Sequence, residues 1–404
     1  MMKRRSLLAT AGAALAASRI PAAHAATLVG VTDTEIKIGH TIPYSGPASA
    51  YGVIGQGHTA FFKRVNDKGG IAGRKINLIS LDDGYAPPKT VEQVRRLVEQ
   101  DQVAFLFNTL GTPNNTAIQK YVNSKKVPHL FLSTGADKWG DPEHFPWTIG
   151  WQPSYRTEAQ IYAKYIMKNR PGAKVAVLYQ NDDFGKDYIT GFKDGFGKDY
   201  AKYVVKEFSF EVTDATIDSQ AVSMQATGAD VILTAATPKF AAQMIRKVSD
   251  MDWKPLHFLT NVSSSVGAVI TPAGPERAVG IITSAYGKDP TDPTWANDAG
   301  MNEWRAFMKE YIPTGDLTDG GYVFSYGVCT TLMQMLKQCG TDFSRENVMK
   351  QATSLKDLYI PTLLPGITVS TSPTNFHPIR QMQLQKWTGK TWELFGEIIE
   401  GTGA

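Results

Sequence analysis

The sequence predicts an α/β protein with two doubly wound, mainly parallel sheets. Apolar runs typical of buried strands alternate with stretches of helical periodicity along most of the chain. The alternation is interrupted near residue 150 by the aromatic- and proline-rich segment FPWTIGWQPSYRTEAQ, and it then starts again. Because 404 residues are enough for about two or three domains, the interruption indicates two similar halves of about 120 residues each, followed by a late return segment.

The first half is predicted from four apolar runs and the helical patterns between them. The strand patterns are EIKIGHTI, KINLISLDD, VAFLF and VPHLFLST. Helices are expected over about 55–67, about 88–100 and 114–123. Before the third helix, Thr112 followed by Pro113 fits an N-cap with proline at the first helical position.

The second half repeats this order. Its strand patterns are KVAVLYQ, YVVKEFSF, ADVILTAA, LHFLTN and VGIITSAY. Helices are expected over 155–169 and 185–197, from about Ser219, and in a segment running through Lys247. The stretch GKDPTDPTWANDAG is expected to be exposed, and two further helices are expected around residues 304 and 332.

Residues 1–25 are predicted to be a cleavable signal peptide. A basic start at 3–5 precedes an apolar stretch of Leu and Ala, and Ala23-His24-Ala25 fits an A-x-A cleavage site. Arg4-Arg5 leaves two export routes open, the twin-arginine route and general secretion. No later run of about 18 apolar residues follows. We therefore expect a soluble mature protein in the periplasm.

Composition argues against several function classes. The net charge of +4 comes from scattered residues, so nucleic acid is not an expected partner. Cys329 and Cys339 lie ten residues apart on a predicted helix, which separates them by about 15 Å, too far for a disulfide. No phosphate loop, nucleophile elbow or histidine pair is present, and no histidine neighbours a cysteine in the sequence. Catalytic residues, cofactors and metal ligands are therefore not expected.

The polar candidates follow the predicted strands. In open α/β sheets ligands bind beyond the carboxyl ends of the strands, so these loops are the expected site. The adjacent carboxylates of Asp82-Asp83 and Asp182-Asp183 point to opposite sides, and loop hydrogen bonds are their expected role.

The segment NTLGTPNNTAIQ admits two interpretations. The N-terminus of a helix carries unpaired N–H groups and a partial positive charge, and Gly111 allows a close approach to the backbone. The segment is thus a candidate socket for an anion such as a carboxylate. An ordinary capped helix is the alternative.

Several ordered motifs resemble solute-binding proteins of the leucine/isoleucine/valine-binding type, which serve ATP-driven (ABC) importers in bacteria. They are IKIGHTIPYSGPASAYG, VNDKGGIAGRKINLISLDDGYAPPKTVEQVRRLV, KVPHLFLSTGA and KVAVLYQNDDFGKD. The resemblance implies the type I periplasmic binding fold, with two lobes joined by a three-strand hinge and a ligand cleft between them. By the same resemblance, lobe 1 comprises residues 30–152 and 285–365, and lobe 2 comprises residues 153–284 and 366–404.

The resemblance also implies binding positions in both lobes. In lobe 1 the first-loop aromatic matches Tyr51, and the hydroxyl that holds the ligand carboxylate matches Thr112. Gly135, Ala136 and Asp137 match the segment after the fourth strand that meets the ligand's polar head. In lobe 2 the matches are Phe184, Thr237 or Pro238, and Val262. Loop or core packing is the alternative for these residues.

One departure concerns the ligand's charge. Amino-acid binders of this family place a glutamate where this sequence has Val262, and a buried ammonium without an anionic partner is costly. Either Asp137 supplies the charge, or the ligand has no ammonium and is a simpler acid. Candidate wall aromatics, about half of which we expect to touch the ligand, are Tyr44, Tyr51, Tyr85, Trp139, Tyr155 and Phe184.

The sequence therefore predicts a monomeric periplasmic receptor for a small carboxylate-bearing solute, either an amino acid or an aromatic acid. It would work by hinge closure and deliver its ligand to an ABC permease in the inner membrane. A sensing subunit that reports to a receptor is an alternative, and an exported α/β enzyme is a weaker one because no nucleophile with an adjacent base is found.

Overall fold

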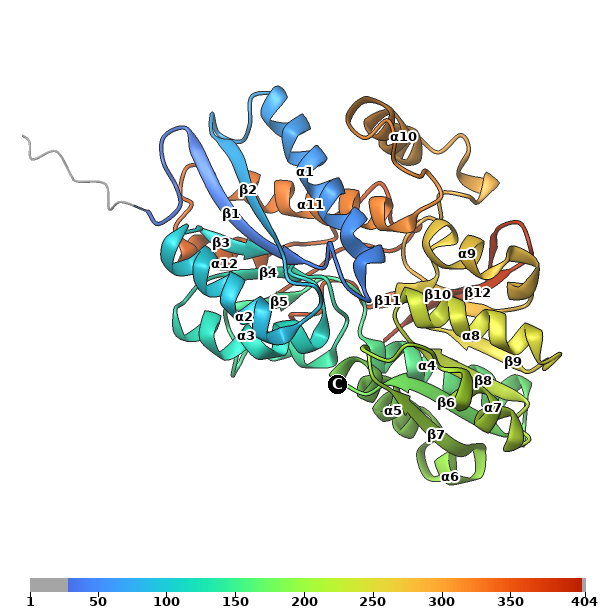
Figure 1. Cartoon of the computed structure of the whole chain (residues 1–404). Helices are drawn as coiled ribbons and strands as arrows, with labels where there is room; N and C mark the ends of the chain where they lie inside the picture. Colours follow the sequence, from blue (N-terminus) through green and yellow to red (C-terminus); the bar gives the residue numbers. More distant parts are fainter. Residues whose placement is uncertain (1–27, 402–404) are drawn as a thin grey trace, which may run out of the picture.

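Five parallel strands form the first sheet, in the order β2-β1-β3-β4-β5 (Figure 1). The structure, a computed structural model, describes residues 28–401, so the predicted signal peptide lies outside the described residues. The strands are β1 (Glu35–Ile42), β2 (Lys75–Asp82), β3 (Phe105–Phe107), β4 (His129–Leu132) and β5 (Thr148–Gly150).

The second sheet has seven strands in the order β12-β11-β10-β9-β8-β6-β7. It is parallel from β10 to β7, whereas β11 runs antiparallel to both β10 and β12. The two mainly parallel sheets confirm the predicted α/β class. Strand β5 and the last two strands were not predicted, although QMQLQKW alternates as a strand should. The strands are β6 (Val175–Gln180), β7 (Val204–Phe210), β8 (Val231–Ala235), β9 (Leu256–Leu259), β10 (Ile282–Ala285), β11 (Gln381–Trp387) and β12 (Trp392–Glu400).

Helices from both ends of the chain cover the first sheet. One apolar cluster joins Ile38 of β1 and Phe107 of β3 to Trp304 and Leu332, so the segment containing α10–α12 packs with the N-terminal half. We call this body the first lobe. Its helices are α1 (Gly52–Asp67), α2 (Pro87–Arg95, continued by a π-helical turn, Arg96–Gln100), α3 (Thr112–Ser124), α10 (Ala299–Tyr311), α11 (Gly320–Gln338) and α12 (Arg345–Ala352).

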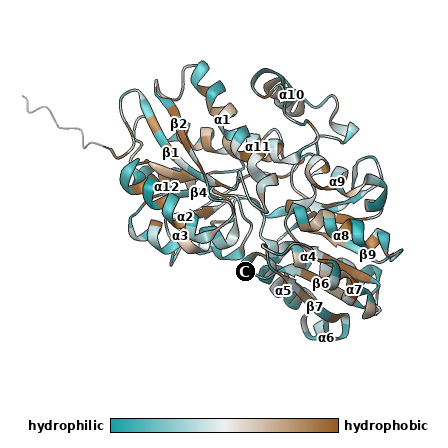
Figure 2. Cartoon of the chain, in the orientation of Figure 1, coloured by the Kyte–Doolittle hydropathy of each residue, from teal (hydrophilic) through white to brown (hydrophobic). Residues whose placement is uncertain are grey.

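The second sheet is covered on both faces and forms the second lobe. Val175 and Val177 of β6 pack in a cluster with α4 and α5, and Ala176 and Leu178 pack with α7 and α8. Because alternate strand residues point to opposite faces, such a strand must be apolar throughout, as the brown strands in Figure 2 show. The helices are α4 (Tyr155–Asn169), α5 (Asp183–Phe196), α6 (Tyr200–Tyr203), α7 (Asp218–Ala226), α8 (Pro238–Asp250) and α9 (Thr271–Ala273).

Two local predictions were wrong. Helix α3 begins at Thr112, and Gly111, with φ of +100°, is its N-cap. Pro113 fits the second helical position equally well because no N–H is needed in the first turn.

The second wrong prediction concerns the segment from 287 to 300, which is not exposed throughout. Lys288 is buried, because its ammonium pairs with Asp298 at 2.8 Å and donates to the carbonyl of Pro361 at 2.8 Å.

Cys329 and Cys339 are free and buried, which confirms the predicted thiols. Within residues 28–401, no helix is long and apolar enough to cross a membrane.

Candidate functional site

A cavity of about 1240 Å³, part of it open to solvent, is lined by residues of both lobes. The first lobe contributes residues 50, 51, 53 and 54 around the start of α1 and 110–112 before and in α3. The second contributes residues that follow the strands, among them Pro238 after β8 and Asn261 after β9. The cavity thus lies beyond the carboxyl ends of the strands, where ligands bind in such sheets.

The structure brings five of the eight predicted site residues to this cavity, namely Tyr51, Thr112, Phe184, Thr237 and Val262. Gly135, Ala136 and Asp137 are not among the lining residues. Gly135 is closely packed, since a Cβ there would lie 2.3 Å from the carbonyl oxygen of Pro153. Whether any of the eight contacts a ligand stays a prediction.

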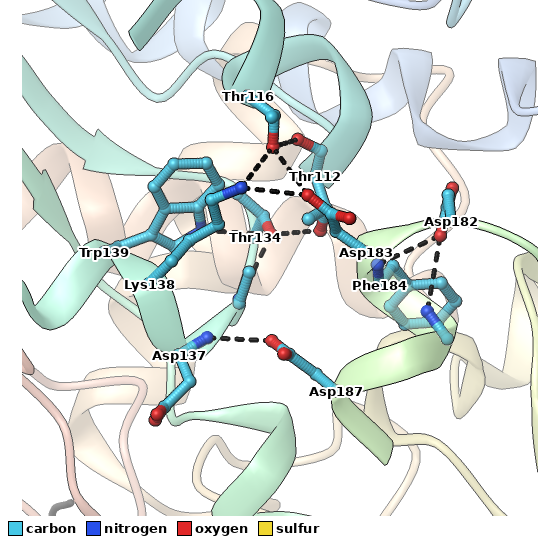
Figure 3. A network of polar contacts seen from close by, with 12 residues as sticks. Thr112, Thr116, Thr134, Asp137, Lys138, Trp139, Asp182, Asp183, Phe184 and Asp187 are labelled. Carbon is cyan, nitrogen blue, oxygen red and sulfur yellow. Dashed lines mark hydrogen bonds and ion pairs between the residues drawn. The ribbon is translucent and has the colours of Figure 1, made fainter. Parts of the chain in front are cut away.

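The carboxylate of Asp137 is engaged within the protein. It accepts a hydrogen bond from Ser154 Oγ at 2.7 Å and pairs with Arg156 at 3.5 Å. Its backbone N–H donates to the carboxylate of Asp187 at 2.8 Å (Figure 3). Its proposed role as the partner of a ligand ammonium gains no support from this arrangement.

Direct contacts join the two lobes. Lys138 of the first lobe lies 2.9 Å from the carboxylate of Asp183 in the second, and this ion pair lowers the pKa of Asp183 (Figure 3). The Tyr51 hydroxyl donates to the carbonyl of Val262 at 3.0 Å. Both contacts require the lobes to be close together, so the described arrangement is a closed one.

Aromatic side chains form much of the cavity wall. Four of the six candidates line it, and Tyr44 and Trp139 do not. The rings of Tyr155 and Phe184 meet edge to face with centroids 5.0 Å apart. Sequence reasoning missed Trp151, Tyr286 and Phe324, which also line the cavity. Tyr286 lies just after β10, so the strand-end rule applied to that predicted strand would have found it. Trp151 follows β5, a strand that was not predicted.

The N-terminus of α3 reaches the cavity without a side-chain cap. By contrast, Ser154 caps α4 and Asp182 caps α5. The first N–H groups of α3 therefore have no side-chain acceptor. The Thr112 hydroxyl lies 2.6 Å from that of Thr134, which sequence reasoning also missed.

A buried carboxylate, Glu158, holds the loop after β9. It accepts hydrogen bonds from the backbone N–H and the side-chain amide of Asn261, at 2.9 and 2.7 Å. The hydroxyls of Tyr162 and Tyr188 also donate to it. Burial raises its pKa to about 7. Because Asn261 and Val262 line the cavity, Glu158 positions part of the wall from behind.

One histidine contacts a cysteine in space, although the two lie far apart in the sequence. His58 Nδ1 lies 3.3 Å from Cys329 Sγ, and His58 Nε2 lies 2.9 Å from Asn108 Oδ1. All three residues are fully buried in the first lobe and none lines the cavity. Burial also raises the pKa of the thiol, so a reactive thiolate is disfavoured. The trio is therefore a polar element of the core.

No histidine or cysteine is among the described residues that line the cavity. The described part of the chain also contains no group of three or more His, Cys, Asp or Glu arranged to hold a metal. Two α/β lobes that enclose such a cavity define a small-molecule binding protein.

The chain belongs to the periplasmic binding protein family, whose model matches residues 35–391. Membership confirms the predicted resemblance and the predicted class of a binding protein. A curated relative, the Leu/Ile/Val-binding protein homolog 7 of Brucella abortus, is 23% identical over 397 residues and covers 95% of this chain and 94% of its own.

Two solved structures show the same fold. A branched-chain amino acid ABC transporter protein from Thermus thermophilus with bound valine has a TM-score of 0.83 at 13% identity, covering 92% of this chain and 98% of its own. A solute-binding protein of an ABC transporter from R. palustris in complex with benzoate has a TM-score of 0.76 at 19% identity. The match covers 91% of this chain and 98% of that protein.

Proposed function

We propose that this protein is the periplasmic solute-binding component of an ABC importer and that it captures a small carboxylate-bearing solute by hinge closure. Family membership and the cavity between the lobes support this function. The partner would be a permease in the inner membrane that recognises the closed form. A sensing subunit would use the same cavity, and only the partner would differ.

The uncapped start of α3 carries the carboxylate part of the proposal. The helix has no side-chain cap, its first residue Thr112 lines the cavity, and the helix dipole favours an anion there. Tyr51 and Phe184 offer aromatic surface from opposite lobes. A ligand that touches both lobes stabilises the closed form, because only such contacts distinguish it from the open one.

An acid without an ammonium group fits this cavity better than an amino acid. The loop from 260 to 263 contains no acidic residue. The acids that line the cavity, Asp289 and Asp319, already accept hydrogen bonds from Thr291 and from Ser265. The two solved relatives hold a valine and a benzoate, both of which carry a carboxylate. We favour an aromatic acid for this protein, and an amino acid is the alternative.

A thermal-shift screen of the mature protein tests the ligand class. The panel is benzoate, phenylacetate, valine, leucine and the primary amides of the two aromatic acids. An aromatic acid in large excess over its Kd is expected to stabilise the protein by a few kcal/mol through mass action. Stabilisation by valine or leucine alone would select the amino-acid alternative. Stabilisation by the amides and not by the acids would contradict the carboxylate site.

Thr112→Val is expected to weaken binding of the acid found in that screen by about 1–3 kcal/mol, because a charged group loses a hydroxyl partner. Titration calorimetry on both proteins measures the difference. Asp137→Asn is the control, and its affinity is expected to match the wild type because Asp137 does not line the cavity. Unchanged affinity in a folded Thr112→Val protein would remove the socket at α3.

A further inference from the structure

We propose that Thr134, which does not line the cavity, fixes the direction of the Thr112 hydroxyl proton, so that Thr112 presents a hydrogen-bond donor to the ligand. Thr134 is thus a positioning residue that makes the site select an acceptor group such as a carboxylate oxygen. The inference deepens the proposed function and rests on it for the identity of the ligand group.

Thr134 is only 1% exposed. Besides the Tyr155 phenol, three polar groups contact its hydroxyl, and Figure 3 shows Thr112 and Trp139 among them. Thr112 Oγ1 lies 2.6 Å from the Thr134 hydroxyl. The backbone N–H of Ala136 and the indole N–H of Trp139 each donate to Thr134 Oγ1 over 3.3 Å. Both nitrogens are donors only, so Thr134 Oγ1 is the acceptor in these two hydrogen bonds.

The direction of the remaining hydrogen bond, between Thr134 and Thr112, follows from counting protons. A hydroxyl oxygen has two acceptor positions and one proton. The two N–H groups occupy both acceptor positions of Thr134, so it has none left for the Thr112 proton. Two oxygens 2.6 Å apart require a proton between them. That proton therefore belongs to Thr134, which donates to Thr112.

The Tyr155 phenol is the other hydroxyl beside Thr134. If Thr134 donated to Tyr155, the contact with Thr112 would need the Thr112 proton, and Thr134 would then accept three hydrogen bonds. Gln152 Nε2 already donates to the Tyr155 oxygen at 3.1 Å, so Tyr155 is satisfied as an acceptor without Thr134. With the direction from Thr134 to Thr112, Thr134 accepts two hydrogen bonds and donates one, which uses its full capacity.

The direction of this hydrogen bond determines which group Thr112 presents to the cavity. With its oxygen accepting from Thr134, Thr112 has its own proton free, and the residue lines the cavity. A carboxylate or carbonyl oxygen placed there accepts this proton. Either oxygen of a carboxylate can accept this proton, whereas a primary amide can accept it only through its carbonyl oxygen, because its amino group is itself a donor. Thr134 would thus help the protein to discriminate an acid from the amide of the same shape.

Neutron crystallography of the deuterium-exchanged, ligand-free protein tests the proton direction without any ligand. The expected result is a Thr134 deuterium on the line to Thr112 Oγ1 and a Thr112 deuterium directed into the cavity. A Thr112 deuterium on the line to Thr134, or a Thr134 deuterium directed at Tyr155, would overturn the inference.

Calorimetry with benzoate and benzamide tests the consequence for binding. Trp139→Phe removes one donor to Thr134 and allows Thr112 to reverse, so the ratio of the benzamide Kd to the benzoate Kd is expected to fall several-fold. Trp147→Phe, a matched change in the same lobe at a residue that does not line the cavity, should keep the wild-type ratio. A loss of affinity equal for both probes in Trp139→Phe would show a structural role only and would overturn the selective one.

The two measurements separate the possible failures. A wild-type protein that binds neither probe would count against an aromatic carboxylate as the ligand, and the neutron density would still decide the proton direction. A reversed deuterium in a protein that prefers benzoate would overturn the role of Thr134 and leave the proposed function standing.

Discussion

Replacement of Glu158 by leucine is expected to lower the free energy of unfolding by about 2–6 kcal/mol, because two partly buried donors lose their acceptor at about 1–3 kcal/mol each. These donors are the backbone N–H and the side-chain amide of Asn261. Tyr162 keeps an acceptor in the carbonyl of Leu259, and Tyr188 keeps Thr260, so they add little. Urea unfolding followed by circular dichroism measures the change.

A surface carboxylate with a similar partner is the control. Glu99 accepts a hydrogen bond from the Tyr121 hydroxyl at 2.8 Å, and the contact is exposed. Glu99→Leu is expected to change stability by less than about 0.5 kcal/mol. If both leucine variants changed stability by the same small amount, Glu158 would not be the anchor of the loop after β9.

Glu158→Gln isolates the charge of this group. The folded pKa of about 7 lies above the ordinary value of 4.5. For a carboxyl raised in this way, the contribution to stability is fully present below pH 4.5 and is lost as the pH rises through 7. The stability of the wild type relative to Glu158→Gln should therefore fall by roughly 3 kcal/mol between pH 4 and pH 8. Parallel pH profiles of the two proteins would contradict the raised pKa.

Much of the cavity was predictable because parallel strands place their carboxyl ends along one edge. Thr112, Phe184, Thr237 and Val262 follow β3, β6, β8 and β9, and all four line the cavity. Their position follows from the alternation of strands and helices, which is a local signal in the sequence. The family resemblance then indicated which residue in each loop to consider.

The groups that hold these residues from behind were not predictable. Glu158 is separated from Asn261 by 103 positions, and nothing local in YRTEAQ indicates a buried carboxylate. Trp139 looked like a wall aromatic, but its indole N–H donates to Thr134 and the residue does not line the cavity. Such contacts depend on side-chain direction and on the packing of distant segments, which the periodicity of a sequence does not encode.

Gly111→Ala is expected to destabilise the protein by about 1–3 kcal/mol and to weaken acid binding at the same time. With φ of +100°, Gly111 has a backbone conformation that an L-residue adopts only with strain. An added Cβ would lie 2.7 Å from Asn114 Oδ1 and 2.8 Å from the Tyr85 ring. Asn114 is held by its hydrogen bond to Thr90 at 2.7 Å, so the tyrosine, which lines the cavity, would have to move.

Gly69→Ala separates the backbone strain from this contact. Gly69 has a similar φ of +97°, and an added Cβ there would meet nothing within 4 Å. Both variants should lose stability through strain, but only Gly111→Ala should bind the acid more weakly, because only its Cβ displaces groups beside the start of α3. Calorimetry with the acid found in the screen, on folded samples of both variants, measures this difference. Wild-type affinity in Gly111→Ala would mean that the ligand does not approach the α3 N-terminus, and the carboxylate would then have to bind elsewhere in the cavity.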